Sequence, residues 1–490
     1  MNKPIRTISI FCLVLFLALM ANVTYLQYFR ADDLNDHAGN ARVFNAAYSR
    51  ERGSIIVGRD PVATSRPIDD QYKYLRTYPQ PFKYAPLTGY FTYAYGASGI
   101  ERSQNDVLSG EDDRLFVTRL VDLLSNDGTQ GGNVALTIDR AAQDAAYEAL
   151  SALPGDVEGS VVALEPRTGK VLAMVSLPTY DPNKLASHDF AEVNKYWAEL
   201  RDNPAEPLLN RGIQKTLPPG SIFKLVTAAA AIESGDYTAA DDLVPGGSTY
   251  QLPLTSGDTG LIDNEGRSCG TDRIPFTQAM AQSCNTTFAR LAVEVGADKM
   301  LEQAEKFGFN REYLEGTGPQ AISRYPENAD AAETGQSGIG QFEVRATPLQ
   351  MAMVAAGIAN DGTVMRPYVV DEVQSADLDV VATTPIEEFS SEAVSPATAA
   401  ELTKMMVYTV DSGTASPAAI PGRSVAGKTG TAQSGTDDPP YAWFMSFAPA
   451  DDPQVAVAVM IESAAIDRGE IAGGRIGGPI AKAVMEAVLR

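Results

Sequence analysis

The chain has 490 residues, of which 44% are apolar, and a formal net charge of −23 at pH 7. This length allows more than one domain with a sizeable core. The negative charge argues against nucleic acid as a partner, because nucleic acids attract basic surfaces, and is typical of a highly soluble acidic domain.

The N-terminus predicts a membrane anchor. Lys3 and Arg6 precede an apolar run that extends from Thr7 to Phe29. About 20 apolar residues span a bilayer, and flanking positive charge stays in the cytoplasm. A cleaved signal peptide is the alternative, but no clear small-x-small cleavage site follows the run. We therefore expect residues 1–30 to form a cytoplasmic tail and one uncleaved transmembrane helix. The protein would then be a single-pass protein of the cell membrane whose remaining chain lies outside the cytoplasm.

Residues 31–150 are expected to form a first extracytoplasmic domain, which is polar and rich in tyrosine. Near its end, the segment from Asn133 to Asp139 predicts a strand. Asp139 is placed to cap the alanine-rich helix that follows.

Residues 151–490 are expected to form a second and larger domain. Two strands joined by a turn are predicted between residues 159 and 176. Helical signals follow, and Thr347 and Ser395, each followed by proline, predict capped helix starts. Three strands and a final helix are predicted near the end, at residues 425–432, 442–448, 454–461 and 480–489. An antiparallel sheet built from both ends of this region, with helices on its faces, is the simplest assembly.

The cysteines leave two states open. Cys12 lies in the anchor, whereas Cys269 and Cys284 are expected in an oxidising compartment. A disulfide between them would close a loop of about 15 residues, worth roughly 3 kcal/mol in the chain-entropy model. The alternative is a pair of buried free thiols. A disulfide is slightly favoured.

The two histidines, His37 and His188, have no neighbouring cluster of metal-type ligands. Both are interpreted as solvated loop residues. The sequence therefore predicts no metal site and no cofactor. A Ser-His-Asp triad would need one of these two residues, so their scarcity favours a mechanism that uses a different base.

A lysine that follows a serine by three residues provides such a base. Two prolines and a glycine form a preset turn just before Ser221, and the apolar, alanine-rich run from Leu225 predicts a buried helix. Lys224 then lies on the same helical face as Ser221. A serine hydroxyl is a poor nucleophile until a base takes its proton, and a lysine can do so once burial and nearby charge lower its pKa.

Two further short motifs follow the serine in the chain. One is Ser283-Cys284-Asn285, and the other is Lys428-Thr429-Gly430, which continues to Thr431. Each motif alone is a weak or moderate signal, but the three together, in this order, are a strong one. A second S-x-N, at residues 103–105, is interpreted as accidental.

These residue types suit acyl transfer, which needs a nucleophile, proton relays and an oxyanion hole. Ser221 is the expected nucleophile, and Lys224 is the base that takes its proton. Ser283 is expected to pass a proton to the leaving amine. The backbone N–H groups of Ser221 and Thr431 are expected to form the oxyanion hole.

The remaining motif residues are expected to bind substrate. Asn285 is placed to hydrogen-bond the substrate's amide backbone as well as the catalytic lysine. Lys428 is expected to keep the local field positive, which favours a neutral base and attracts a substrate carboxylate. The hydroxyls of Thr429 and Thr431 are expected to contact that carboxylate, and Gly430 lies between them.

With these motifs the chain resembles the class B, monofunctional penicillin-binding proteins, and most closely those of actinobacteria. The resemblance covers essentially the whole chain after the anchor. Its other matching segments are Asn210-Arg211, residues 338–341, 347–352, 426–433 and 442–444, and, near the N-terminus, Arg52-Gly53 and Gly99-Ile100-Glu101.

The resemblance implies an α+β fold, that of the serine β-lactamases and penicillin-binding transpeptidases. An antiparallel sheet flanked by helices and an all-helical subdomain would make up the D,D-transpeptidase domain, residues 151–490. Residues 31–150 would be the N-terminal non-penicillin-binding, or pedestal, domain, in which Arg52 and Glu101 form a structural pair. A single transmembrane helix would precede both.

The resemblance also implies a reaction and partners. Ser221 would attack the penultimate D-alanine carbonyl of a peptidoglycan stem peptide ending in D-Ala-D-Ala, and the amine of a neighbouring stem peptide would complete the crosslink. β-Lactam antibiotics would acylate the same serine. No separate transglycosylase domain fits before the catalytic domain, so a polytopic membrane glycosyltransferase is the expected partner. The actinobacterial resemblance leans toward a role in cell division, within wall growth and cell shape.

Two other functions remain open. The first is a hydrolase of the same fold, either a D,D-carboxypeptidase or a β-lactamase. Class A β-lactamases use a glutamate after S-D-N to activate water, whereas Glu206 lies before Ser221, in the wrong order. The second is a non-catalytic β-lactam-binding sensor or scaffold, but sensors of this kind need a signalling partner domain, usually with several membrane spans, and one span is visible.

Overall fold

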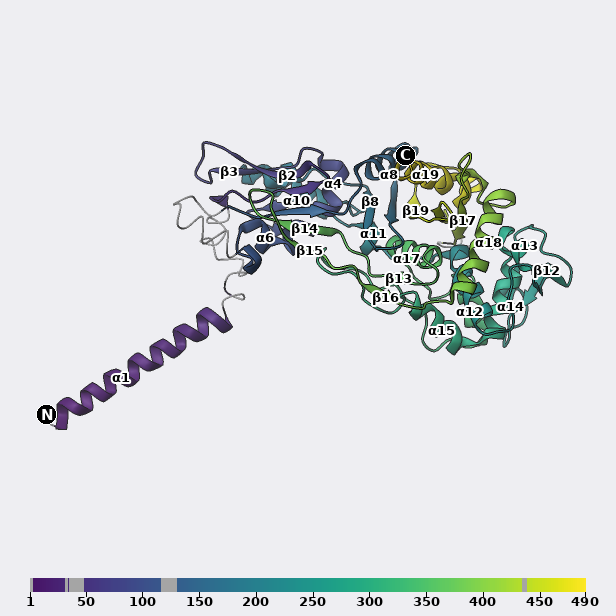
Figure 1. The fold of residues 1–490 in the computed structure, drawn as a ribbon, viewed down its shortest axis with the longest axis horizontal. Coiled ribbons are helices and arrows are strands. Elements are labelled where there is room, and N and C mark those ends of the chain that lie inside the picture. The colour runs from purple at the N-terminus through teal and green to yellow at the C-terminus, as the bar shows by residue number, and fades with distance from the viewer. Residues whose placement is uncertain (1–2, 31–33, 35–47, 116–129, 434–438) are drawn as a thin grey trace.

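The computed structural model describes residues 3–30, 34, 48–115, 130–433 and 439–490 (Figure 1). Helix α1, Lys3–Thr24, continues as a short π-helical turn, Tyr25–Phe29, and none of its side chains is buried. Within the described ranges it is the one helix long and apolar enough to cross a membrane. This agrees with the predicted anchor. His37 lies outside the described residues.

A six-stranded sheet forms the N-terminal part, with strand order β15-β14-β6-β1-β2-β3 (Figure 1). Strands β1 and β6 are parallel, and the other neighbours are antiparallel. Its strands are Ile55–Val57 (β1), Asp60–Pro67 (β2), Tyr74–Thr77 (β3), Asn133–Leu136 (β6), Val370–Gln374 (β14) and Val380–Thr383 (β15). Accompanying elements are helices Pro81–Thr88 (α4), Gly99–Ser103 (α5) and Asn105–Ser109 (α6), the 3₁₀ turn Asp113–Leu115, and the ribbon of Phe91–Thr92 (β4) with Gly96–Ala97 (β5). Strands β14 and β15 thus return to this sheet from far along the chain.

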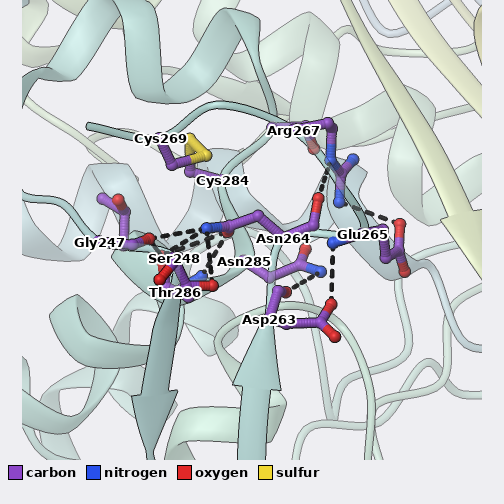
Figure 2. The surroundings of a disulfide bond; sticks show 12 residues. Gly247, Ser248, Asp263, Asn264, Glu265, Arg267, Cys269, Cys284, Asn285 and Thr286 are labelled. Carbon is purple, nitrogen blue, oxygen red and sulfur yellow. Dashed lines mark hydrogen bonds and ion pairs between the residues drawn. A yellow bond between two sulfur atoms is a disulfide. The ribbon is translucent and has the colours of Figure 1, made fainter. Parts of the chain in front are cut away.

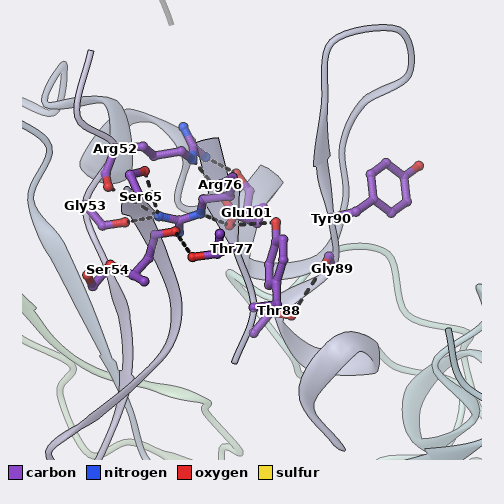
Figure 3. Close-up of polar contacts among 12 residues, drawn as sticks. Arg52, Gly53, Ser54, Ser65, Arg76, Thr77, Thr88, Gly89, Tyr90 and Glu101 are labelled. Carbon is purple, nitrogen blue, oxygen red and sulfur yellow. Dashed lines mark hydrogen bonds and ion pairs between the residues drawn. The ribbon is translucent and has the colours of Figure 1, made fainter. Parts of the chain in front are cut away.

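A buried ionic cluster holds this part together (Figure 3). The Glu101 carboxylate, fully buried, accepts hydrogen bonds from Arg52 Nε at 2.7 Å, Arg76 Nε at 2.6 Å and the Tyr78 hydroxyl at 3.1 Å. Burial acts to raise the pKa of Glu101, but the charges of Arg76 and Arg52 outweigh it and lower that pKa. The predicted partners Arg52 and Glu101 are therefore in contact, and Arg76 is a third member that the sequence did not indicate.

Replacing Glu101 with alanine should lower the free energy of unfolding by about 3–5 kcal/mol, because two buried guanidinium groups lose their carboxylate. Urea denaturation would measure this loss. The matched control is Glu302→Ala, since the Glu302 side chain is 65% exposed in a surface pair with Lys306 and should contribute at most about 1 kcal/mol. Covalent labelling of Ser221 by penicillin should stay near normal in Glu101→Ala. A loss of labelling as large as that in Lys224→Ala would contradict a structural role.

A five-stranded antiparallel sheet forms the second part, with order β17-β18-β19-β7-β8. Pairing of β19 with β7 joins the two ends of the larger region, as predicted. Both faces are covered, so the central strands β18 and β19 are nearly continuous apolar runs rather than alternating ones. The strands are Glu158–Leu164 (β7), Val171–Leu177 (β8), Ala426–Ala432 (β17), Tyr441–Ala448 (β18) and Val455–Ser463 (β19).

Helices cover both faces of this sheet. Helix α8, Arg140–Ser151, packs with α19, Gly473–Val488, on one face, and α17, Pro348–Ala359, packs on the other. The predicted caps are present: the Asp139 carboxylate accepts from Ala142 N at 2.8 Å, and the Thr347 hydroxyl oxygen accepts from Gln350 N at 3.1 Å.

A mainly helical subdomain completes the second part, at the right of Figure 1. Its central helix α12, Lys224–Glu233, is buried along nearly its whole length, as its apolar run predicted. The neighbouring helices are Phe276–Ala281 (α13), Asn285–Val295 (α14), Ala297–Lys306 (α15), Ala331–Ser337 (α16) and Pro396–Ser412 (α18). Short ribbons also occur, formed by Leu243–Pro245 (β9) with Arg273–Pro275 (β12), Thr249–Gln251 (β10) with Leu261–Asp263 (β11), and Val364–Met365 (β13) with Glu388–Ser390 (β16).

The remaining elements of the described chain are short. They are Pro182–Ala186 (α9), Phe190–Arg201 (α10), Arg211–Gln214 (α11) and the 3₁₀ turns Gly220–Phe223, Asp258–Gly260, Ser416–Ala418 and Arg468–Glu470.

The start of the last helix differs from the prediction. The sequence placed this helix at residues 480–489, whereas α19 begins at Gly473. A Cβ atom on Gly473 would lie 2.0 Å from the Trp443 carbonyl oxygen, and one on Gly477 would lie 2.6 Å from Phe444 Cβ. These glycines therefore permit the helix to pack closely on β18.

His188 also differs from the prediction of a solvated loop residue. Its ring packs against Tyr48 and Tyr72, its side chain is 13% exposed, and Nδ1 lies 2.5 Å from Asp70 Oδ2. Sequence spacing gave no sign of this pair, because Asp70 belongs to the N-terminal part of the chain.

Candidate active site

Ser221 lies in a 3₁₀ turn, Gly220–Phe223, that leads directly into α12. Gly220 has φ +54°, and a Cβ atom there would lie 2.5 Å from the Thr431 carbonyl oxygen. Glycine is therefore required for this turn to pack against β17. Ser221 is partly exposed, and in the described part of the chain its hydroxyl has no hydrogen-bond partner.

Lys224 is fully buried and joins the first motif to the second. Its Nζ donates to the Ser283 carbonyl oxygen at 2.8 Å, to Asn285 Oδ1 at 2.6 Å and to Ser283 Oγ at 3.3 Å. The amine also lies over the Phe288 ring, 5.6 Å from the ring centroid. The structure thus places the predicted base against the predicted proton relay.

Lys428, on edge strand β17, brings the third motif into the same cluster. It is also fully buried, and its Nζ donates to Ser283 Oγ at 2.9 Å and to the Thr429 carbonyl oxygen at 2.8 Å. The Ser283 hydroxyl therefore lies between two lysine amines, in a position to move a proton between them.

Burial and neighbouring charge set the protonation of these amines. Burial is the main cause that holds the pKa of Lys224 well below its usual value, followed by the positive charges of Lys428 and Arg267. Burial and then Arg267 likewise lower the pKa of Lys428. The Lys428 charge acts on Lys224 and favours the neutral form of that amine. A neutral amine is the form that can take a proton from serine.

The Ser283 backbone is held in an unusual conformation. Its φ is +56°, in the left-handed region, which costs a non-glycine residue about 1–2 kcal/mol. Backbone bonds from Ser283 N to the Met280 oxygen and from Cys284 N to the Ala279 oxygen hold the turn. Strain of this kind clusters at functional sites.

The predicted disulfide is present beside this turn (Figure 2). Cys269 and Cys284 are bonded, with their Cα atoms 5.8 Å apart, and the free cysteine is Cys12 in α1. Because Cys284 is the middle residue of the second motif, the bond ties that motif to the loop that follows β11. Elsewhere, no group of three or more His, Cys, Asp or Glu side chains within the described ranges is arranged to hold a metal ion.

The rest of the third motif lies along β17. Gly430 packs against Pro219, where a Cβ atom would lie 3.0 Å from the carbonyl oxygen. Thr431 is exposed. The Thr429 hydroxyl lies 2.8 Å from that of Thr414, a neighbour that the sequence did not indicate, since Thr414 belongs to no motif. Alternate N–H groups of an edge strand face its open side, which is compatible with the predicted oxyanion hole and carboxylate contacts.

Comparison with known proteins identifies the two parts. Residues 159–486 match the penicillin-binding protein transpeptidase domain, and residues 52–134 match the penicillin-binding protein A dimerisation domain. The chain is 44% identical to the peptidoglycan D,D-transpeptidase PbpA of Mycolicibacterium smegmatis and 42% identical to that of Mycobacterium tuberculosis. Each alignment covers 100% of this chain and 99% of the relative.

Solved structures agree with this similarity. Penicillin-binding protein A from M. tuberculosis, as its ceftriaxone acyl-enzyme complex, superposes with a TM-score of 0.85 at 40% identity. The match covers 91% of this chain and 100% of that one. The penicillin G acyl-enzyme complex of the same protein gives 0.83, covering 90% and 100%. The chain therefore belongs to the penicillin-binding proteins and carries their transpeptidase domain and fold.

Proposed function

We propose that this protein is a peptidoglycan D,D-transpeptidase in which Ser221 forms the acyl-enzyme. The observation that carries the proposal is the buried cluster of Lys224, Ser283 and Lys428, which joins three motifs on the transpeptidase fold of the family. The relatives named above as D,D-transpeptidases, similar over the whole chain, support the same reaction.

In the first half of the reaction, Ser221 Oγ attacks the penultimate D-alanine carbonyl, and its proton passes to neutral Lys224. The oxyanion that forms is stabilised by the N–H groups of Ser221 and Thr431. Ser283, hydrogen-bonded to both lysines, relays a proton to the departing D-alanine amine as its C–N bond breaks. The product is an ester between Ser221 and the stem peptide.

In the second half, the amine of a neighbouring stem peptide attacks this ester. It loses a proton through the same relay, and the C–O bond to Ser221 breaks, so the serine recovers its hydrogen. Asn285 would hold the donor's amide backbone throughout. Lys428, with the Thr429 and Thr431 hydroxyls, would hold the terminal carboxylate before D-alanine leaves.

β-Lactams would acylate Ser221 in the same way, and intact-protein mass spectrometry tests this. After incubation with penicillin G, one adduct should be found, and peptide mapping should place it on Ser221. The adduct should last for hours, because no residue of the cluster is assigned to activate a deacylating water. Loss of the adduct within seconds would instead favour a β-lactamase, and an adduct on another residue would reject the proposed nucleophile.

The cellular setting belongs to the same proposal. Helix α1 would anchor the protein as a single span, with the transpeptidase domain outside the cytoplasm. The division into residues 1–30, 31–150 and 151–490 would hold, with β14 and β15 contributed to the N-terminal sheet. A polytopic membrane glycosyltransferase would supply the glycan strands, and the role would lie in cell division. The acidic surface would exclude nucleic acid.

A further inference from the structure

A third cation, Arg267, lies near the active site and contacts no substrate group in the reaction derived above. Its Nε donates to the Asn264 carbonyl oxygen at 2.8 Å, and its Nη2 donates to Glu265 Oε2 at 3.0 Å (Figure 2). The side chain is 26% exposed. Within the described ranges these are the hydrogen bonds of the guanidinium group. Because that group carries five N–H donors, most of its donors are available to a ligand.

The loop that carries Arg267 is tied to the second catalytic motif. Asn285 Nδ2 donates to the Asp263 carbonyl oxygen at 3.0 Å. The side chain of Asn264, nearly fully buried, accepts from Thr286 N at 3.0 Å and donates to Thr286 Oγ1 at 3.0 Å. The disulfide described above fixes the loop on the other side of Arg267. The position of the guanidinium group is therefore coupled to the N-terminus of α14.

The positive charge of Arg267 acts on the two lysine amines of the active site. It contributes, after burial, to the low pKa values of Lys224 and Lys428, so it lies within electrostatic reach of both amines. Its present partner, Glu265, has a side chain that is 61% exposed. An exposed ion pair of this kind contributes little, and a carboxylate of a bound ligand can take the place of Glu265.

We propose that Arg267 binds a side-chain carboxylate of the acyl-donor stem peptide and so selects donors that carry it. This inference rests on the proposed transpeptidase function. The terminal D-alanine carboxylate is assigned to Lys428 on β17, and the amide backbone is assigned to Asn285. The donor residue just before D-Ala-D-Ala would then lie next to the loop that is hydrogen-bonded to Asn285, which is the loop that carries Arg267. A guanidinium group binds a carboxylate in a two-pronged geometry that a carboxamide cannot match.

The test compares two synthetic pentapeptides ending in D-Ala-D-Ala. The side chain of the third residue is a carboxylate in one and the corresponding carboxamide in the other. D-Alanine release by the full-length protein in detergent, with the same acceptor amine at a fixed concentration throughout, gives kcat/KM for each donor. The wild type should prefer the carboxylate by about tenfold or more, through KM, as expected for a hydrogen bond to a charged group. Arg267→Gln should abolish the preference, and Arg267→Lys should keep part of it.

The ratio of the two values within one variant cancels any effect of Arg267 on Lys224, since both donors use the same base. The matched control is Arg290→Gln, which removes an exposed arginine and its pair with Glu294 from α14 and should leave the ratio unchanged. Equal kcat/KM for both donors in the wild type, or an unchanged ratio in Arg267→Gln, would overturn the assignment of Arg267 alone. Release of D-alanine from neither donor would overturn the transpeptidase function and, with it, this inference.

Discussion

Replacing Ser221 with alanine should abolish covalent attachment of penicillin and leave the fold intact. The Ser221 hydroxyl is partly exposed and has no hydrogen-bond partner in the described part of the chain, so its removal should change the free energy of unfolding by less than about 0.5 kcal/mol. Yet its oxygen is the atom that forms the ester in the proposed reaction. After incubation with penicillin G, the mass of the variant should be unchanged, whereas the wild type should gain one adduct.

A second variant separates the nucleophile from the proton relay. Ser283 has φ +56°, so Ser283→Gly removes its hydroxyl without adding backbone strain. This variant should still form an adduct on Ser221, but about 10²–10⁴-fold more slowly, the range for a lost acid–base group. An adduct that forms on Ser221→Ala at the normal rate would show that another residue is the nucleophile. If Ser221→Ala lost the adduct yet fully complemented a deletion strain, the scaffold function would be favoured instead.

The three motifs could be predicted from the sequence because each is a local pattern with a chemical reason. The turn before Ser221, the strand that carries Lys428 and the cap at Thr347 all depend on residues close in the chain. Their meeting point followed from the family resemblance, and the Ser283 hydroxyl is where the structure joins them.

Contacts that depend on distant residues could not be predicted in this way. Arg76, on β3, completes the cluster around Glu101. Thr414, which follows the end of α18, contacts Thr429 on β17. His188 pairs with Asp70, and these two residues are too far apart in the chain for a local sequence pattern to predict their contact. The early start of α19 was also missed, because its glycines add nothing to an apolar pattern, yet they allow the helix to approach the sheet closely.

Removing the charge at Lys428 should move the rise of the acylation rate to higher pH. The proposed reaction needs neutral Lys224, so the rate should rise as pH increases through the pKa of that amine. Burial first, and then the charges of Lys428 and Arg267, hold this pKa well below its usual value. In Lys428→Met one of those charges is lost, the pKa of Lys224 rises, and a larger fraction of the base is protonated at a given pH. The rate of adduct formation with penicillin, measured across pH, would show the shift.

Loss of Lys428 should also weaken binding of the β-lactam carboxylate, which lowers the rate at every pH. Only the horizontal displacement of the profile therefore tests the electrostatic coupling. Lys404→Met is the matched control, because Lys404 is exposed on α18 in a pair with Glu401 and should leave the profile in place. A profile for Lys428→Met that falls without moving, or moves to lower pH, would mean that Lys428 does not hold Lys224 neutral.

A histidine is not the group that would cause such a shift. His188, the one histidine in the described ranges, packs against Tyr48 and Tyr72 in the N-terminal part. A shift caused by Lys428→Met would therefore report on the lysine base.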